Sequence, residues 1–242
     1  MNSMLLTPKN LKEMLKLAIT TFYLTVVLSK LTVFSGTKIK GNFFPFIALL
    51  HSDSSICTGS LVKGDKVVTA AHCICNKDTM KQVVFQRNKY ENINGVHVKI
   101  EDSFVDEKYR KTCLELVADG SSPTIVSGFD LSVVKLERDL TGIAGIFVVS
   151  IEDTEIVQAG WPVMTIGYGI DPNSDVDAEA GILRNGFVFT RDCPIPMEDD
   201  PICVVPDEKN VQISSPGDSG GPLLDYMRGK IIASVSGQIS LL

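Results

Sequence analysis

Short apolar runs separated by turn residues dominate the chain after about residue 40. Glycine, proline, asparagine and aspartate bound most of these runs, and no long helical period follows the N-terminal region. Regular short strands with glycine-rich turns are typical of an all-β sandwich or barrel. The expected strands are residues 44–51, 60–62, 66–69, 83–86, 96–100, 131–136, 146–151, 163–168, 182–190, 202–205 and 230–235.

Two stretches lack this alternation and are expected to be surface loops or insertions. They are residues 101–127, which contain Cys113, and residues 171–181. A boundary near residues 150–160 divides the strands about evenly. The pattern therefore predicts an N-terminal β-domain over 30–155, with a short pro-segment, and a C-terminal β-domain over 156–242.

An apolar run from Leu17 to Ser29 lies between Lys16 and Lys30. The run is too short to cross a bilayer comfortably, so stable membrane insertion is not expected. A basic flank, a short apolar core and a small residue at its end are typical of a secretory signal peptide, here residues 1–29. A buried amphipathic helix, a signal anchor, a start at Met14 and cleavage at Ser35 stay open as alternatives.

Composition indicates the compartment in which the protein is expected to fold, and it gives no support for a nucleic-acid partner. The 242 residues are 44% hydrophobic and 21% charged, with a formal charge of −6, which gives no reason to expect a nucleic-acid partner. Six cysteines in a secreted chain indicate three disulfides. The spacing of Cys73 and Cys75 is too tight for the usual zinc pair, and only three histidines are present, so no metal or cofactor is expected.

The most distinctive chemistry lies in the stretch Gly217-Asp218-Ser219-Gly220-Gly221. Glycines allow a sharp turn and a close approach of other backbone, so Ser219 would be exposed with neighbouring N–H groups beside it. A nucleophile with an oxyanion hole needs this arrangement. The alternative is a Gly-Ser turn that merely ends a strand.

Two further residues gain meaning only together with Ser219. His72 follows an expected strand and precedes Cys73, and a bridge from Cys73 to Cys57 would hold the hairpin beneath it. Asp130 stands at the start of another expected strand. Taken singly, a structural histidine and a strand-capping aspartate would explain both residues.

Four ordered motifs resemble the chymotrypsin/trypsin family of serine proteases. They are Cys57-Thr-Gly-Ser-Leu, Thr69-Ala-Ala-His72-Cys73, Asp130-Leu-Ser-Val-Val-Lys-Leu and Gly217-Asp-Ser219-Gly-Gly-Pro-Leu. The resemblance extends from about Val33 to Ser236. It implies two perpendicular antiparallel β-barrels with the active site in the cleft between them. The chain stops at Leu242, soon after Ser219, so the second barrel is expected to be incomplete and the chain to be a C-terminally truncated member.

The resemblance also assigns roles to residues. Ser219, His72 and Asp130 correspond to the catalytic triad, and the N–H groups of Gly217 and Ser219 to the oxyanion hole. Ser236 corresponds to a serine that lines the specificity cleft and supports the aspartate. The resemblance further implies an activation salt bridge between Asp218 and a new N-terminus at Val33. The resemblance places Ile213 at the floor of the specificity pocket, and because this residue is not acidic, Arg and Lys are not expected to be preferred.

The remaining cysteines complete the expected disulfides. Cys193 and Cys203 match a short loop bridge of the family, and Cys75 and Cys113 are paired by elimination.

The sequence therefore predicts a secreted serine endopeptidase that is made as a zymogen and cleaves peptide bonds through an acyl-enzyme. Its expected partners are protein or peptide substrates and protein inhibitors. The alternative is a catalytically weak or inactive secreted homologue that acts by binding. A disulfide-rich β-module without this chemistry is a third reading.

Overall fold

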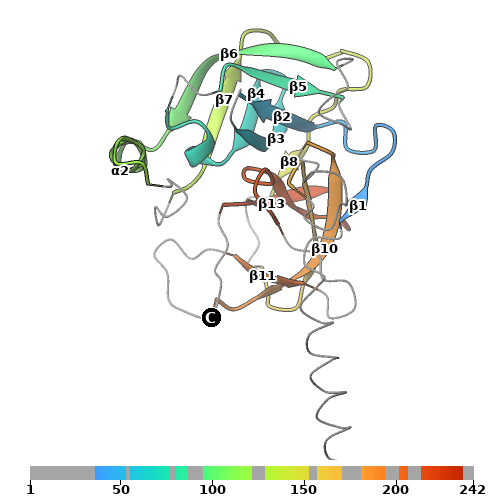
Figure 1. Ribbon diagram of the computed structural model, residues 1–242. Coiled ribbons are helices and arrows are strands. Elements are labelled where there is room, and N and C mark those ends of the chain that lie inside the picture. The colour runs from blue at the N-terminus through green and yellow to red at the C-terminus, as the bar shows by residue number, and fades with distance from the viewer. Residues whose placement is uncertain are drawn as a thin grey trace, which may run out of the picture. The chain divides into compact units, whose positions relative to one another are not determined.

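The computed structural model describes residues 36–52, 55–76, 80–86, 95–121, 129–152, 157–170, 181–193, 202–206 and 214–236 (Figure 1). Contacts divide the chain into Met1–Val33, which lies outside these residues, and Phe34–Leu242, to which all of them belong. The expected signal peptide, Val33, Ile213 and nearly all of the expected loop at 171–181 lie outside the described residues.

The N-terminal half forms a closed antiparallel barrel in the order β2-β3-β4-β7-β6-β5 (Figure 1). Its interior is apolar because β-branched and aromatic residues of the strands point inward, including Val67, Val83, Phe85 and Val134, none of which is exposed. The strands are β2 (Ile47–His51), β3 (Ile56–Lys63), β4 (Lys66–Thr69), β5 (Gln82–Phe85), β6 (Val96–Val105) and β7 (Ser132–Leu136).

Strand β6 closes the barrel by turning a corner. Residues 96–99 pair with β5, and residues 100–105 pair with β7, with a register shift between Ile100 and Asp102. An extra residue at such a bulge bends the strand and increases its twist, which lets a single strand serve two neighbours.

The C-terminal half forms a seven-stranded sheet in the order β1-β10-β9-β12-β13-β8, with β11 also paired to β10. A second hydrophobic core packs against this sheet, and its buried residues include Met164, Ile166, Tyr168, Leu183 and Leu224. The strands are β1 (Thr37–Lys38), β8 (Ser150–Ile151), β9 (Pro162–Gly167), β10 (Arg184–Arg191), β11 (Cys203–Pro206), β12 (Pro222–Asp225) and β13 (Lys230–Ser234).

Two short strands from the N-terminal half belong to this second sheet. β1 pairs with β10, and β8 pairs in parallel with β13. A division at residue 155 therefore separates both strands from the sheet that they join. The all-β class with two β units is confirmed, and most expected strands lie within a few residues of those observed.

One expectation from the pattern is wrong. Residues 101–105 extend β6, and residues 107–118 form helix α2 (Glu107–Ala118) instead of a loop. Asp106 caps this helix by accepting a hydrogen bond from the Tyr109 N–H at 3.0 Å. Only Tyr109 and Cys113 of the helix are buried. Apolar residues do recur at helical spacing, at Tyr109, Cys113, Leu116 and Val117, so the sequence contains a signal for this helix that the expectation of a loop overlooked.

Two smaller expectations also fail. The strand expected over residues 146–151 is limited to β8, although Val149 N–H still donates to the Leu61 carbonyl at 2.9 Å. Strand β12, which follows the glycines after Ser219, was not expected. Proline and glycine bound its short apolar core. Because these residue types are typical of turns, the pattern did not indicate a strand there.

Candidate active site

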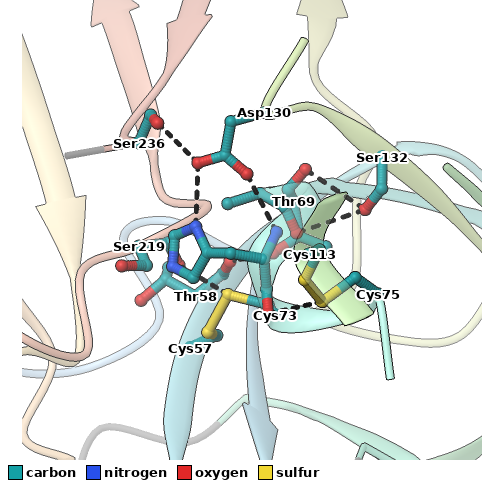
Figure 2. Close-up of polar contacts among 12 residues, drawn as sticks. Cys57, Thr58, Thr69, Cys73, Cys75, Cys113, Asp130, Ser132, Ser219 and Ser236 are labelled. Atoms are coloured by element: carbon teal, nitrogen blue, oxygen red, sulfur yellow. Dashed lines mark hydrogen bonds and ion pairs between the residues drawn. A yellow bond between two sulfur atoms is a disulfide. The ribbon is translucent and has the colours of Figure 1, made fainter. Parts of the chain in front are cut away.

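His72 lies in a single turn of 3₁₀-helix, η1 (Ala71–Cys73), directly after β4. The extended backbone of Ala70 ends the strand, and the Cys57–Cys73 disulfide ties the turn back to β3 (Figure 2). A nitrogen of the His72 ring and the two sulfur atoms of this bridge all lie within 4.8 Å of one another. The bridge closes a loop of 16 residues, for which about 3 kcal/mol of stabilisation is typical.

Asp130 reaches His72 because β4 and β7 are paired neighbours, with Thr69 opposite Ser132. Just before β7 the backbone makes a three-residue turn around Asp130, in which Leu131 N–H donates to the Phe129 carbonyl at 2.6 Å. Phe129 has a φ of +52°, a conformation that side-chain-bearing residues rarely adopt. The turn therefore holds the carboxylate at the end of the barrel where η1 lies.

The Asp130 carboxylate contacts His72 at two points. Its Oδ1 accepts from the His72 backbone N–H at 2.9 Å, and its Oδ2 lies 2.8 Å from the ring Nδ1 (Figure 2). Ser236, which follows β13, also donates its hydroxyl to Oδ2 at 2.5 Å. The side chains of His72 and Asp130 are only 8% and 6% exposed, so little water competes for these contacts.

These contacts fix the charge of Asp130 and the tautomer of His72. Burial raises the pKa of Asp130, but the hydrogen bond and attraction from His72 and the Ser236 hydroxyl more than offset it, so the pKa falls below its usual value. An ionised carboxylate only accepts hydrogen bonds, so the proton is assigned to Nδ1. The lone pair of Nε2 is then available on the other side of the ring.

Ser219 lies in the loop over residues 214–221, which we call the nucleophile loop. Its carbonyl accepts from the Thr58 N–H at 2.8 Å and lies 3.9 Å from the Cys73 sulfur. On the far side of Ser219, Gly220 N–H donates to the Val235 carbonyl at 2.7 Å. Both barrel strand β3 and the chain after β13 therefore hold the loop, which brings Ser219 to the Cys57–Cys73 disulfide (Figure 2). The sulfur atoms of this disulfide lie within 4.8 Å of a nitrogen of the His72 ring.

Gly220 permits this close contact. It has a φ of +82°, and a Cβ there would collide with the Thr69 hydroxyl and the Thr58 carbonyl. Thr58 also donates its hydroxyl to the Gly217 carbonyl at 2.8 Å. Only glycine therefore fits the place where the nucleophile loop presses against the barrel.

The two N–H groups assigned to an oxyanion hole belong to the same loop. Gly217 has a φ of +102°, and within the described part of the chain neither its N–H nor that of Ser219 donates to another group. Backbone donors that are not used within the fold remain able to bind an anionic oxygen.

Asp218 is one of the residues that line a pocket. Its Oδ1 accepts from Gly169 N–H at 2.8 Å, and its Oδ2 accepts from the Ser215 N–H at 2.8 Å and the Ser215 hydroxyl at 3.1 Å. Burial raises the pKa of Asp218, and these hydrogen bonds together with the positive charge of Arg184 oppose the rise. Gly36 also lines this pocket, which encloses about 360 Å³ including its mouth.

The structure contains three disulfides, and they join the pairs that we expected. These are Cys57–Cys73, Cys75–Cys113 and Cys193–Cys203. Among the described residues, the one cluster with possible metal-ligand atoms is Cys57, His72 and Cys73. Both of its sulfur atoms are in the disulfide and offer no thiolate, so this cluster does not fit a zinc ion.

Sequence reasoning missed two residues of the site. Thr58 links the nucleophile loop to the barrel, and its place beside Cys57 in the first motif was the available signal. Tyr109 on α2 is 2% exposed, and burial together with the negative charge of Asp130 raises the pKa of its phenol. Tyr109 was given no role in the sequence analysis because its segment was expected to be a loop.

No helix within the described ranges combines the length and the apolar character that crossing a bilayer requires.

Comparison with known proteins agrees with this architecture. The family model described as trypsin matches residues 33–240. The chain is 33% identical to the cercarial protease of Schistosoma mansoni over 201 residues, which are 82% of this chain and 76% of that protein. It is 26% identical to brachyurin of Leptuca pugilator, with 79% and 80% covered, and 25% identical to trypsin delta of Drosophila erecta, with 79% and 73% covered. The chain therefore belongs to the trypsin family of serine proteases.

Proposed function

We propose that this protein is a secreted serine endopeptidase in which Ser219 is the nucleophile, His72 the general base and Asp130 the residue that orients it. The two-point contact between Asp130 and His72 carries the proposal, because it leaves Nε2 able to accept a proton. The contact of the Ser219 carbonyl with the Cys57–Cys73 bridge, beside the His72 ring, supports the choice of nucleophile.

The reaction proceeds in two halves. Ser219 Oγ attacks the substrate carbonyl carbon while Nε2 of His72 takes the hydroxyl proton, and the oxyanion binds to the N–H groups of Gly217 and Ser219. His72 then gives the proton to the leaving amine, which breaks the peptide bond and leaves an ester on Ser219. Water, activated by His72, hydrolyses this ester and restores the hydroxyl. Losing one oxyanion donor would cost about 3–4 kcal/mol of transition-state stabilisation.

Asp218 is the proposed acceptor for an activating N-terminus. Cleavage before Val33 would give an ammonium group that pairs with the buried carboxylate. The pocket around Asp218 supports this, because Gly36, only three residues after Val33, lines it. The pair would stabilise the nucleophile loop and relieve the cost of the buried charge.

Specificity is proposed to depend on Ile213 and Ser236. An apolar Ile213 at the pocket floor would leave the charge of a substrate Arg or Lys without a partner, so apolar side chains are expected to be preferred. Ser236 would line the same cleft while it supports Asp130, with which it is hydrogen-bonded.

The proposed life history is that of an exported zymogen. Residues 1–29 are the proposed signal peptide, followed by β-domains over 30–155 and 156–242. Three disulfides are typical of proteins that fold in an oxidising compartment. Protein or peptide substrates follow from the protease family, and protein inhibitors are proposed as further partners.

The decisive experiment combines a fluorophosphonate serine probe with mass spectrometry of the mature N-terminus. Labelling of the processed wild type, its loss in Ser219→Ala and its retention in Ser150→Ala are the expected results. Ser150 is an exposed serine in β8 and serves as the matched control. A correctly folded wild-type protein that takes up no probe would favour a binding homologue. Peptide substrates with apolar or basic residues before the cleaved bond then test the specificity.

A further inference from the structure

Arg184 is a buried cation in the pocket that contains Asp218. It belongs to β10 and is 7% exposed. Among the described residues that line this pocket, Arg184 and Asp218 are the only two with ionisable side chains. A charged side chain is rarely buried unless an opposite charge or several hydrogen bonds compensate for the loss of water. The pocket therefore brings together a cation of β10 and an anion of the nucleophile loop.

Gly169 connects the two charged groups. Its N–H donates to Asp218 Oδ1 at 2.8 Å, and its carbonyl accepts from Arg184 Nη1 at 3.5 Å. The same Nη1 also donates to the Ile182 carbonyl at 3.4 Å. Hydrogen bonds to carbonyl oxygens satisfy donors but leave the net charge of a guanidinium in place. The guanidinium is therefore held one residue away from the carboxylate, by contacts that do not require a free N-terminus.

The segment that precedes β1 leads to the same pocket. β1 lies beside β10, with Thr37 opposite Asn185 (Figure 1). A Cβ on Gly36 would lie 3.1 Å from the Arg184 Cβ, so the Gly36 backbone packs against the Arg184 side chain. Three residues of extended chain span at most about 10 Å. An ammonium group at Val33 would therefore come close to a pocket that already contains a guanidinium.

We propose that Arg184 is an internal counter-ion of Asp218, which partly replaces the activating ammonium group and gives the unprocessed chain a basal activity. The inference rests on the proposed function, because it concerns the same acceptor, Asp218, and the same loop around Ser219. Arg184 is a positioning residue in this proposal. It acts through Asp218 and contacts neither the substrate nor Ser219.

The geometry makes this replacement partial. The guanidinium contacts the Gly169 carbonyl and the carboxylate contacts the Gly169 N–H, so the backbone of one residue lies between these two contacts. Attraction between two charges weakens as their distance grows. In agreement, the positive charge of Arg184 lowers the pKa of Asp218, but burial raises this pKa by more. Cleavage before Val33 would add a second positive charge, so processing should increase an existing activity.

The test uses a chain with an enteropeptidase recognition sequence, Asp-Asp-Asp-Asp-Lys, inserted between Thr32 and Val33. The same preparation is assayed before and after cleavage, and mass spectrometry verifies both N-termini. The rate of labelling by a fluorophosphonate probe measures the reactivity of the nucleophile without knowledge of the substrate. Wild type is compared with Arg184→Met, Arg184→Lys and Arg191→Met. Arg191 is an exposed residue of the same strand and serves as the matched control.

The two forms of Arg184→Met should differ sharply. Before cleavage, we expect its labelling rate to be about tenfold below that of the wild type, because Asp218 loses its counter-ion and the nucleophile loop is less ordered. After cleavage, its rate should be within about twofold of the wild type, because the new ammonium group supplies the charge. Arg184→Lys keeps the charge and should keep most of the reactivity before cleavage. Arg191→Met should match the wild type in both forms.

A double-mutant cycle tests the pair without any measurement of activity. Arg184→Met, Asp218→Asn and the double variant are compared by urea unfolding of the uncleaved chain on a Ser219→Ala background. With Asp218 present, Arg184→Met should lower the urea midpoint by about 0.5–1 M, because it leaves a buried carboxylate without its counter-ion. On the Asp218→Asn background, the same change should leave the midpoint unchanged or raise it, because it removes an unpaired cation.

The two proposals fail differently. A wild type that is not labelled before or after cleavage contradicts the proposed function, and the cycle still decides whether Arg184 and Asp218 interact. Labelling of the wild type only after cleavage overturns the basal activity. Arg184→Met labelling that is unchanged before cleavage, or that falls equally in both forms, overturns the replacement of the ammonium group. Equal midpoint shifts on the two backgrounds overturn the ion pair itself.

Discussion

The two halves of the proposed active site are built in different ways. The side that carries His72 and Asp130 rests on a closed barrel, with two disulfides and a helix packed against η1. The nucleophile loop, over its described residues, contains no disulfide and is held by hydrogen bonds to β3, to the chain after β9 and to the chain after β13, with glycines at positive φ where it turns. It also contains a buried carboxylate, Asp218. The barrel side is therefore expected to form by folding alone, whereas the nucleophile loop depends on how the charge of Asp218 is neutralised.

This contrast explains why one side is suited to regulation. A covalently fixed element has one low-energy arrangement, whereas a loop that is held by hydrogen bonds around a buried carboxylate can have several of similar energy. A change at Asp218, such as the arrival of an ammonium group, can select among these arrangements without disturbing the barrel.

The largest expected effect is the loss of the barrel-side carboxylate. Asp130→Asn should lower kcat by about 10⁴-fold, because the amide can donate to Nδ1 and favour the wrong tautomer. Ser236→Ala, which removes one donor to the same oxygen, should cost about tenfold. Steady-state kinetics of both variants measure the difference, and comparable losses would contradict the assignment of Asp130 as the residue that orients His72.

A smaller but still large effect is expected from Gly220→Ala in the nucleophile loop. The new Cβ would collide with Thr58 and Thr69, so the loop must move away from the barrel and kcat/KM should fall about a hundredfold or more. Gly160→Ala is the matched control, because Gly160 has a φ of +84° but no atom within 4 Å of such a Cβ. That variant should lose about 1 kcal/mol of stability and keep its activity.

Equal losses of activity in these two glycine variants would show that backbone strain alone decides the outcome. The contact between the nucleophile loop and the barrel would then not be what determines the activity.

Removing disulfides should separate stability from activity. For the double Cys→Ala variants of Cys57–Cys73 and Cys193–Cys203, whose loops have 16 and 10 residues, loop entropy predicts similar losses of about 3 kcal/mol. Only the first of these two bridges lies near the Ser219 carbonyl, at 3.9 Å, and has both sulfur atoms within 4.8 Å of a nitrogen of the His72 ring. We therefore expect kcat to fall about tenfold in the first variant and to change little in the second. Thermal unfolding and kinetics below the melting temperature check this, and equal kcat values would contradict it.

The smallest effect is a difference in pH dependence. The folded pKa of Asp130 is lowered, so its contribution to stability is present above the unfolded value near 3.9 and is lost as the pH falls through the folded value. The folded pKa of Asp218 is raised. The cost in folding free energy of its buried charge is therefore fully present when the pH is above the folded pKa, and it disappears as the pH falls toward the unfolded pKa near 3.9.

Urea unfolding between pH 7 and pH 2.5, on a Ser219→Ala background that prevents autolysis, measures this difference. Relative to Asp218→Asn, the protein should gain stability as the pH falls toward 3.9. Relative to Asp130→Asn, it should lose stability below that pH. Each slope is limited to about 1.4 kcal/mol per pH unit for one proton. Two slopes of the same sign would show that the carboxylates have similar environments.

The sequence by itself determined the strand pattern and the motifs around His72, Asp130 and Ser219. These features are local: alternation, turn residues and short motifs depend on neighbours along the chain. Helix α2 was not expected, although apolar residues recur in it at helical spacing, and the disulfide that joins it to the segment after η1 is a long-range contact.

Only the tertiary structure decided which groups meet. The pairing of Thr69 with Ser132 brings Asp130 to His72, and the contact of Gly220 with the barrel brings Ser219 beside the Cys57–Cys73 bridge. The pairing of β1 with β10 and the burial of Asp218 were likewise visible only in the folded chain. The reason is physical: burial and the donors around a carboxylate depend on segments that are distant in sequence, and no local pattern encodes them.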